Sequence, residues 1–158
     1  MLSAELVEFL EGGCSQIVAT VDAAGDAHAG RAWGIEVLDA VAGRLRLLLD
    51  AADARTLANL AGPDPRLACT GADVRTLHSR QVKGRASGVE PATGADRARA
   101  ARYCDEFFTD IEETDGEPRA LLDQIVPAAY VVCTMVVEAV YDQTPGPGAG
   151  AALRAGTP

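Results

Sequence analysis

The stretch HSRQVKGRASG, residues 78–88, decides how the rest of the sequence is interpreted. It is strand-like, follows a turn, and holds Lys83, the only lysine in an acidic chain rich in alanine and valine. Side chains alternate between the two faces of a strand, so Gln81 and Lys83 share a face and can offer hydrogen bonds to the polar edge of a ring. The stretch therefore predicts a strand that forms one wall of a ligand site.

Length and charge limit the classes of protein to consider. The 158 residues predict one domain, residues 1–142, followed by a flexible tail rich in proline, glycine and alanine, residues 143–158. Hydrophobic residues make up 48% of the chain, which suffices for an ordinary core. The net charge is −9, from 23 acidic and 14 basic residues, and this argues against nucleic acid as a partner. Any anion site must depend mainly on arginine, which binds phosphate through paired hydrogen bonds.

The cysteines and the N-terminal sequence bear on the expected location. Cys14, Cys69, Cys104 and Cys133 are far apart and show no C-x-x-C spacing, so they predict buried free thiols and no metal site. The opening sequence MLSAELVEFLEGG has no basic region and does not resemble a signal peptide. No apolar run reaches transmembrane length. The expected location is the cytoplasm, and no membrane partner is expected.

Hydrophobic periodicity and turn residues predict about six strands and two main inserted helices. The strands are expected at residues 15–21, 28–38, 44–49, 66–70, 75–89 and 129–141. Helices are expected at residues 3–11, 50–61 and 95–108, with an acidic loop at 109–118 and further helical turns at 119–126. Asp53 is the expected N-cap of the second helix. Short connections favour antiparallel pairing, so the sequence predicts an α+β fold, mostly β, built around a small barrel.

Hydrolytic and metal chemistry find no support in the sequence. There is no G-x-S-x-G motif, and His28 and His78 have no serine or cysteine partner by motif. No helix carries an H-x-x-x-H or H-x-x-E pattern, so no metal ligands are predicted. Each histidine is expected to be a strand residue at a hairpin or at the mouth of the barrel.

Arg31 lies in the predicted strand at residues 28–38. Strand alternation predicts that it shares a face with Trp33, Ile35 and Val37. The opposite face carries only the small residues Gly30, Ala32 and Gly34. Small residues let a flat ring or another backbone come close to a strand, so this segment is a candidate cofactor contact.

Arg55 lies in the first turn of the predicted helix 50–61. Free backbone amides and the helix dipole favour an anion at that position. The competing interpretation is that Arg31, Arg55, Gln81 and Lys83 are surface residues at the barrel mouth, which form local salt bridges with the abundant acids.

Three pieces of the sequence, in this order, resemble the pyridoxamine 5'-phosphate oxidase-like, FMN-binding split-barrel family. They are SQIVATVDAAGDAHAGRAWGIEV (residues 15–37), LRLLLDAADARTLANLAGPDPRLA (45–68) and SRQVKGRA (79–86). The resemblance in the order of elements covers about residues 3 to 141. It implies a split antiparallel β-barrel with inserted helices, FMN as the cofactor, and a homodimer that holds the cofactor in a cleft between its subunits.

The resemblance also implies which residues would hold the flavin. The second strand would line the cofactor, the strand–helix corner at residues 50–56 would hold the phosphate, and the quoted strand would face the ring or its ribityl chain. By position these residues are Arg31, Ala32, Trp33, Gly34, Asp50, Arg55, Thr56, Gln81 and Lys83. No catalytic side chain is assigned, because the cofactor carries the redox chemistry in such sites.

Some positions depart from the family pattern. In the corner, Asp50, Ala54 and Thr56 replace the hydroxyl residues and the lysine that are common in the family. Tyr103 is followed one helical turn later by Phe107 rather than arginine, so pyridoxamine 5'-phosphate oxidase activity itself is not expected. The leading hypothesis is a flavin-dependent oxidoreductase acting on a small molecule. The alternatives are a non-catalytic protein that binds a flavin, a deazaflavin or haem, and a cofactor-free scaffold on the same fold.

Overall fold

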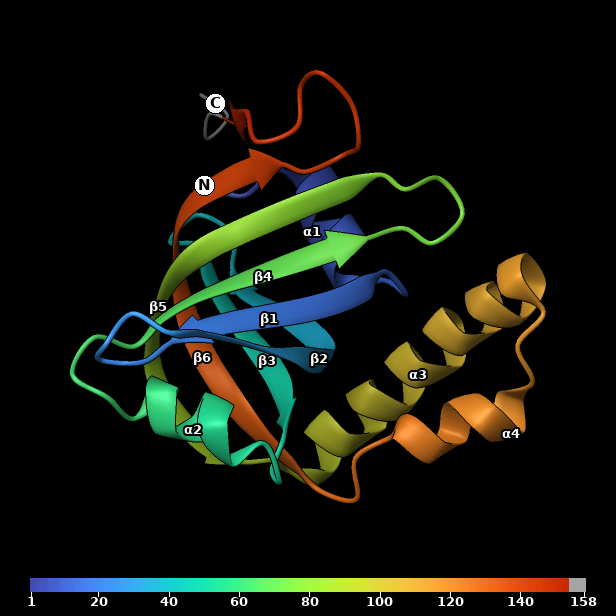
Figure 1. Cartoon of the computed structure of the whole chain (residues 1–158), viewed down its shortest axis with the longest axis horizontal. Coiled ribbons are helices and arrows are strands. Elements are labelled where there is room, and N and C mark those ends of the chain that lie inside the picture. Colours follow the sequence, from blue (N-terminus) through green and yellow to red (C-terminus); the bar gives the residue numbers. More distant parts are fainter. Residues whose placement is uncertain (154–158) are drawn as a thin grey trace.

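The structure is a computed structural model that describes residues 1–153 of the chain, and its centre is a six-stranded barrel (Figure 1). The barrel strands are β1 (Ser15–Val21), β2 (Ala27–Asp39), β3 (Arg44–Asp50), β4 (Arg66–Ala72), β5 (Ser79–Pro91) and β6 (Tyr130–Asp142). The helical elements are α1 (Ala4–Glu11), α2 (Ala54–Leu60), α3 (Gly94–Asp115), α4 (Arg119–Leu122) and the single 3-10 turn η1 (Asp123–Ile125). The predicted α+β, mostly β, fold class is confirmed.

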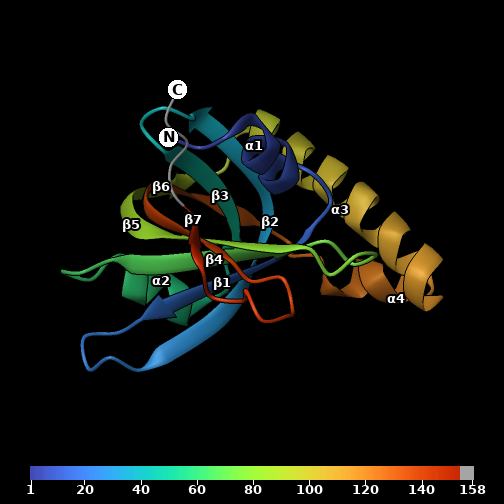
Figure 2. The ribbon, with the colours of Figure 1, turned by 90° about the horizontal axis from the view of Figure 1, so that it is seen from above.

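All strand pairs are antiparallel, and the sheet closes on itself. The strand order is β3-β2-β1-β4-β5-β6, and β3 also pairs with β6 from Arg44 opposite Val136 to Asp50 opposite Tyr130. Figure 2 shows α3 and α4 together on one side of the barrel. Closure matters for the fold because it leaves no long unpaired strand edge.

Two hydrophobic clusters share the barrel wall. The first fills the interior and includes Leu10, Leu45, Leu47, Leu49 and Met135. The second lies between the wall and α3 and includes Trp33, Leu48, Phe107, Phe108 and Val132. Successive residues of β3 point to opposite sides of the wall, so this strand is buried on both faces. Helix α3 is therefore fixed to the barrel by its own core.

Strand β2 carries a bulge that the sequence pattern did not predict. Its pairing with β3 shifts between Ala32 and Ile35, where Gly34 has a φ of 119°. As a result Ala32 and Ile35 both lie in the interior cluster, while Trp33 packs beneath α3. The predicted common face of Trp33 and Ile35 is wrong, because an extra residue in a strand reverses the alternation beyond it.

Helix α3 continues beyond the predicted end at residue 108 and through the predicted acidic loop. Ile111 packs against the second cluster, whereas Asp110 and Glu113 lie on the outer side and form ion pairs with Arg75. The helix ends at Asp115, before Gly116 in the left-handed conformation with φ 74°. The acidic composition of the segment thus marks a solvated helix face rather than a loop.

Strand β5 begins later than predicted. The Asp73 carboxylate accepts hydrogen bonds from the backbone amides of Arg75 and Thr76, at 2.9 and 2.8 Å. The amide of Asp73 donates to the carbonyl of His78 at 2.9 Å, which closes a turn. Residues 75–78 therefore belong to this aspartate-centred turn, and the strand starts at Ser79.

The predicted tail, residues 143–158, returns to the barrel in its described part. The amide of Gln143 donates to the carbonyl of Ser79 at 2.9 Å, and the short strand β7 (Ala152–Leu153) pairs with the end of β6. Residues 143–153 thus form a loop that leaves the end of β6 and is held at the barrel by its two ends. The rest of the predicted tail lies outside the described residues.

Candidate functional site

Two rows of side chains cross the outer face of strands β1, β2, β4, β5 and β6. Strand register places Arg31, Ile17, Thr70, Gln81 and Tyr141 side by side in one row. The adjacent row consists of Ala29, Ala19, Ala68, Lys83 and Ala139. In Figure 1, β1, β4 and β5 cross the front of the molecule above α2 and to the left of α3, and no helix is drawn in front of them. We call these ten residues the open face.

A hollow of about 430 Å³ lies on the open face, and its lining includes Ala19, Ala68, Lys83 and Tyr141. The Lys83 ammonium lies 4.8 Å from the centroid of the Tyr141 ring. Ligand sites commonly measure about 300–1,000 Å³ and combine apolar walls with a few polar groups. The hollow has that size and several alanines in its lining, together with two cations, Lys83 and Arg66, and one carboxylate, Glu138.

Gln81 adds an amide to the same face. Its Nε2 donates to the hydroxyl of Thr70 at 2.8 Å, and Gln143 Nε2 donates to its carbonyl oxygen at 3.4 Å. The prediction that Gln81 and Lys83 share a face of one strand is confirmed. Together they place amide and ammonium donors beside a surface of small residues, which suits a flat ligand with polar edges.

Arg31 stands at the border between the open face and α3. Its guanidinium carbon lies 5.1 Å from the Phe107 ring centroid and 5.7 Å from that of Trp33, and its NH2 group is 3.5 Å from the Ser15 hydroxyl. Among residues 1–153 it forms no ion pair with a carboxylate, and its Nε is buried without a hydrogen-bond partner. Arg31 therefore points toward α3 and has unused hydrogen-bonding capacity.

Tyr103 of α3 provides a second unused donor. The residue is only 3% exposed, and its hydroxyl has no hydrogen-bond partner. Burial raises the pKa of this phenol well above its usual range, and the charge of nearby Arg31 only partly opposes the effect. The hydroxyl is protonated at neutral pH.

The corner between β3 and α2 is occupied by the carboxylate of Asp53. One oxygen accepts from the Thr56 amide at 3.0 Å and lies 3.0 Å from His28 Nε2, and the other accepts from the Thr56 hydroxyl at 2.7 Å. Partial burial acts to raise the pKa of Asp53, but hydrogen bonds from Thr56 and His28 outweigh it and hold the pKa below the usual range. A negative charge is thus built into the start of α2, as the predicted N-cap at Asp53 requires.

The corner does not fit a phosphate in the way the resemblance implied. Thr56 is 2% exposed and bonded to Asp53, and Asp50 points its carboxylate at the amide of Ala52, at 2.8 Å. Arg55 is exposed and forms no ion pair among residues 1–153. Two carboxylates and one free arginine in a single short corner are a poor setting for a dianion.

The remaining predicted contacts on β2 are structural. Ala32 is fully buried inside the barrel, and Trp33 is 3% exposed beneath α3. A Cβ at Gly34 would lie at ordinary contact distances from α3, 3.5 Å from Tyr103 and 3.6 Å from Arg99, so it is the φ of 119° that favours glycine at the bulge. Ala32, Trp33 and Gly34 therefore serve packing in this structure, and their contact with a cofactor stays a prediction.

Three residues of the two polar sites were not predicted as site residues. Thr70 and Tyr141 join Gln81 and Lys83 only through the register of β4, β5 and β6. His28 reaches Asp53 across 25 positions of sequence. A period-of-two pattern could have indicated the exposed face of each strand, but nothing in the sequence specifies the register.

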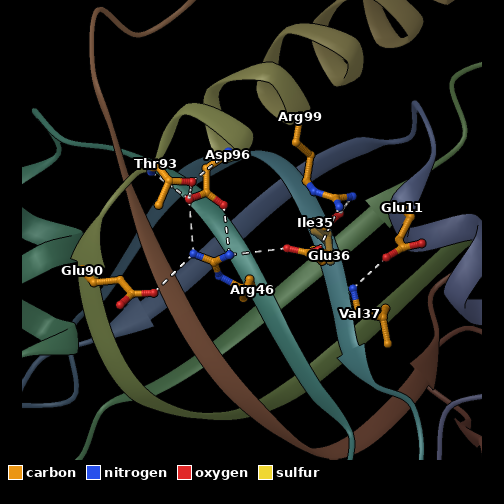
Figure 3. A network of polar contacts seen from close by, with 9 residues as sticks. All are labelled: Glu11, Ile35, Glu36, Val37, Arg46, Glu90, Thr93, Asp96 and Arg99. Carbon is orange, nitrogen blue, oxygen red and sulfur yellow. Dashed lines mark hydrogen bonds and ion pairs between the residues drawn. The ribbon is translucent and has the colours of Figure 1, made fainter.

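A separate cluster of ion pairs, built around Arg46, lies at the start of α3 (Figure 3). Arg46 forms ion pairs with Asp96 at 3.1 Å, Glu90 at 3.2 Å and Glu36 at 3.5 Å, and Arg99 pairs with Glu36 at 3.0 Å. Asp96 is only 2% exposed and completes the capping box of α3 with Thr93. This cluster is fully paired and ties α3 to β2, β3 and β5.

Residues 1–153 contain no group of three or more histidine, cysteine or acidic side chains placed to hold a metal ion. Within the same range, no helix is long and apolar enough to span a membrane. The cysteines are all buried and free, as predicted.

Comparison with known proteins shows similarity of structure but not of sequence. The sequence matches no protein-family model and no curated protein. HupZ from Group A Streptococcus superposes with a TM-score of 0.58 at 17% identity, covering 95% of this chain and 100% of its own. A pyridoxamine 5'-phosphate oxidase candidate from Lactobacillus delbrueckii gives 0.56 at 18% identity, covering 89% and 93%.

An F420 reductase gives a TM-score of 0.51 at 17% identity and covers 84% of this chain and 92% of its own. These similarities cover between 84% and 95% of this chain. At such low identity they establish the fold alone. The chain has the split-barrel fold of the pyridoxamine 5'-phosphate oxidase-like, FMN-binding proteins.

Proposed function

We propose that this chain binds a flavin-type cofactor on the open face and acts as a flavin-dependent oxidoreductase on a small molecule. The observation that carries the proposal is the hollow floored by Ala19 and Ala68, with Lys83 over Tyr141 at its edge. A bound flavin would supply the redox chemistry, and the protein would bind and orient the ring. The split-barrel neighbours include an F420 reductase, which supports this class of function.

The side chains of the open face suit the ring of a flavin. Alanine side chains let a flat ring lie against the strands, and Lys83 and Gln81 can donate hydrogen bonds to ring nitrogens and oxygens. Haem is less favoured, because its iron is most often held by a histidine. His28 is paired with Asp53, and His78 packs against Phe9 with ring centroids 5.3 Å apart.

The partner that covers the ring is, in this proposal, a second copy of the chain. A ring lying on an open sheet face keeps its other side exposed, so one subunit alone leaves the site incomplete. Ile17 is 39% exposed in the middle of the same face, where an apolar side chain gains from burial. Sedimentation should report a dimer, and Ile17→Glu should give a monomer that binds flavin weakly. A monomeric wild-type protein with full flavin affinity contradicts the shared site.

The absorbance spectrum of the purified protein tests the cofactor class. Flavin bands support the proposal, whereas a Soret band identifies a haem carrier. If the protein is purified without a cofactor, added flavin is titrated. No binding then favours the cofactor-free scaffold, which the occupied α2 corner already makes the leading alternative. Anaerobic reduction of bound flavin by a nicotinamide donor separates an enzyme from a non-catalytic flavin carrier.

Substitution at the hollow tests its position. Lys83→Met should weaken flavin binding about tenfold, because it removes the cation that faces the ring. Arg80→Met is the matched control on the same strand, since Arg80 is paired with Asp142 and does not line the hollow. Fluorescence quenching of the flavin measures both affinities. Equal affinities in the two variants would show that the ring binds elsewhere.

A further inference from the structure

We infer that the corner at the start of α2 excludes phosphate, and that this chain prefers riboflavin to its 5'-phosphate, FMN. The inference rests on the proposed binding of a flavin ring. The inference adds the chemical form of the ligand, riboflavin. This form differs from FMN, the cofactor that the family resemblance implied. The reason is that the protein fills the corner with its own anion.

The Asp53 carboxylate makes the contacts that a bound anion would make there. It accepts from the Thr56 amide at 3.0 Å and from the Thr56 hydroxyl at 2.7 Å, and it pairs with His28 at 3.0 Å. A Cβ built on Gly30 would lie 2.5 Å from its second oxygen, so the carboxylate is packed directly against the backbone of β2. No donor in this set is left for a phosphate.

The surrounding charges do not compensate for a second anion. Asp50 adds a carboxylate from the loop, held by the Ala52 amide at 2.8 Å. His28 from β2 is already paired with Asp53, and Arg55 on α2 is exposed to solvent. On the barrel side, Asn59 donates its amide to the Thr20 hydroxyl at 2.9 Å, which adds no charge. A phosphate at the corner would meet two negative groups and, at most, one solvated arginine.

Displacing Asp53 is also unfavourable. The side chain is the N-cap of α2, and removal of an N-cap hydrogen bond destabilises a helix. The helix has only seven residues, from Ala54 to Leu60, so few other hydrogen bonds are present to offset the loss of this cap. The internal carboxylate and a ligand phosphate therefore compete for one position, and the carboxylate is tethered there by the chain.

The test compares riboflavin and FMN by fluorescence quenching at one fixed, neutral pH. For the wild-type protein, riboflavin should bind at least as tightly as FMN. Asp53→Asn keeps an N-cap side chain but removes the charge, and it should improve FMN binding about tenfold relative to riboflavin. Asp39→Asn is the control, because Asp39 caps the β2–β3 turn by accepting from Val41 and Ala42. It should leave the ratio of the two affinities within about twofold of wild type.

The outcomes separate this inference from the proposed function. Wild-type protein that binds FMN tenfold more tightly than riboflavin overturns the inference but keeps the flavin site. An unchanged ratio in Asp53→Asn also overturns it, and Asp53→Ser, another N-cap, provides the same test if the asparagine variant is poorly folded. Binding of neither flavin by the wild type overturns the proposed function and the preference with it.

Discussion

Two half-buried arginines on the outer side of the barrel, Arg46 and Arg31, differ in their partners. Arg46 on β3 is 19% exposed and contacts the carboxylates of Glu36, Glu90 and Asp96 (Figure 3). Arg31 on β2 contacts aromatic rings and no carboxylate within residues 1–153. Both lie beside α3, so location on the barrel does not explain the difference.

The different partners imply different roles: Arg46 holds neighbouring elements together, whereas Arg31 keeps donors that could bind a ligand. A buried charge surrounded by opposite charges holds its neighbours in place, and losing one partner leaves the others uncompensated. A buried guanidinium with an unpartnered Nε gains little from the fold and loses hydration. Arg31 therefore contributes little to stability, and its free donors are available to an acceptor at the edge of the open face.

The largest loss of unfolding free energy is expected for Arg46→Ala. The variant leaves Asp96 charged, buried and without its main cation, and it should lose about 3 kcal/mol of unfolding free energy. Arg44→Ala on the same strand is the control, because Arg44 pairs with Asp39 at the surface and should cost about 0.5 kcal/mol or less. Denaturant unfolding measures both. Equal losses would show that the Arg46 cluster has no structural role beyond that of a surface pair.

An intermediate effect on the unfolding free energy is expected from protonation of the Asp96 carboxylate. Burial acts to raise the pKa of Asp96, but hydrogen bonds from Thr93 and the Arg46 charge outweigh it and lower the pKa. A carboxyl whose pKa is lower in the folded state stabilises the protein above its unfolded pKa, about 3.9, and this contribution is lost as the pH falls through the folded pKa.

Wild-type protein should therefore exceed Asp96→Asn in unfolding free energy by about 2 kcal/mol at pH 7, and the difference should shrink below about pH 4. Unfolding curves of the two proteins between pH 7 and 3 measure the difference, and the other carboxylates cancel in the comparison. A difference that stays constant across this range rules out a contribution from the Asp96 charge.

The smallest effect is expected for Arg31→Leu. Two cation–π contacts are lost, but a poorly hydrated charge is removed as well, so the unfolding free energy should stay within about 1 kcal/mol of wild type. The same denaturant unfolding measures it. A loss as large as that of Arg46→Ala would remove the distinction between the two arginines and make Arg31 a structural residue.

Much of the fold could be predicted from local patterns. Alternating residues identified β1 without error, and an aspartate followed by a helical pattern identified Asp53 as the N-cap of α2. The patterns failed where contacts distant in sequence decide the structure. At the acidic end of α3, Ile111 packs against the second hydrophobic cluster and Arg75 pairs with the helix's acids, and a local reading of composition cannot reveal either contact.

The candidate site was predicted less well than the fold. Gln81 and Lys83 lie on one face, because alternation along an unbroken strand is a local property. Trp33 and Thr56 are buried, because a bulge in β2 and an internal hydrogen bond to Asp53 turn them away from solvent. The burial of these two side chains depends on local backbone geometry and on contacts that residue type alone does not specify.

The sequence by itself determined the order of strands and helices, the N-cap of α2 at Asp53 and the acidic net charge, since these follow from residue type and short-range geometry. The tertiary structure decided which side chains meet. Strand register set Lys83 beside Tyr141, closure of the barrel gave α3 a face to cover, and the fold of residues 28–56 placed Asp53 where a phosphate was expected. These contacts depend on register and packing, which local sequence patterns do not encode.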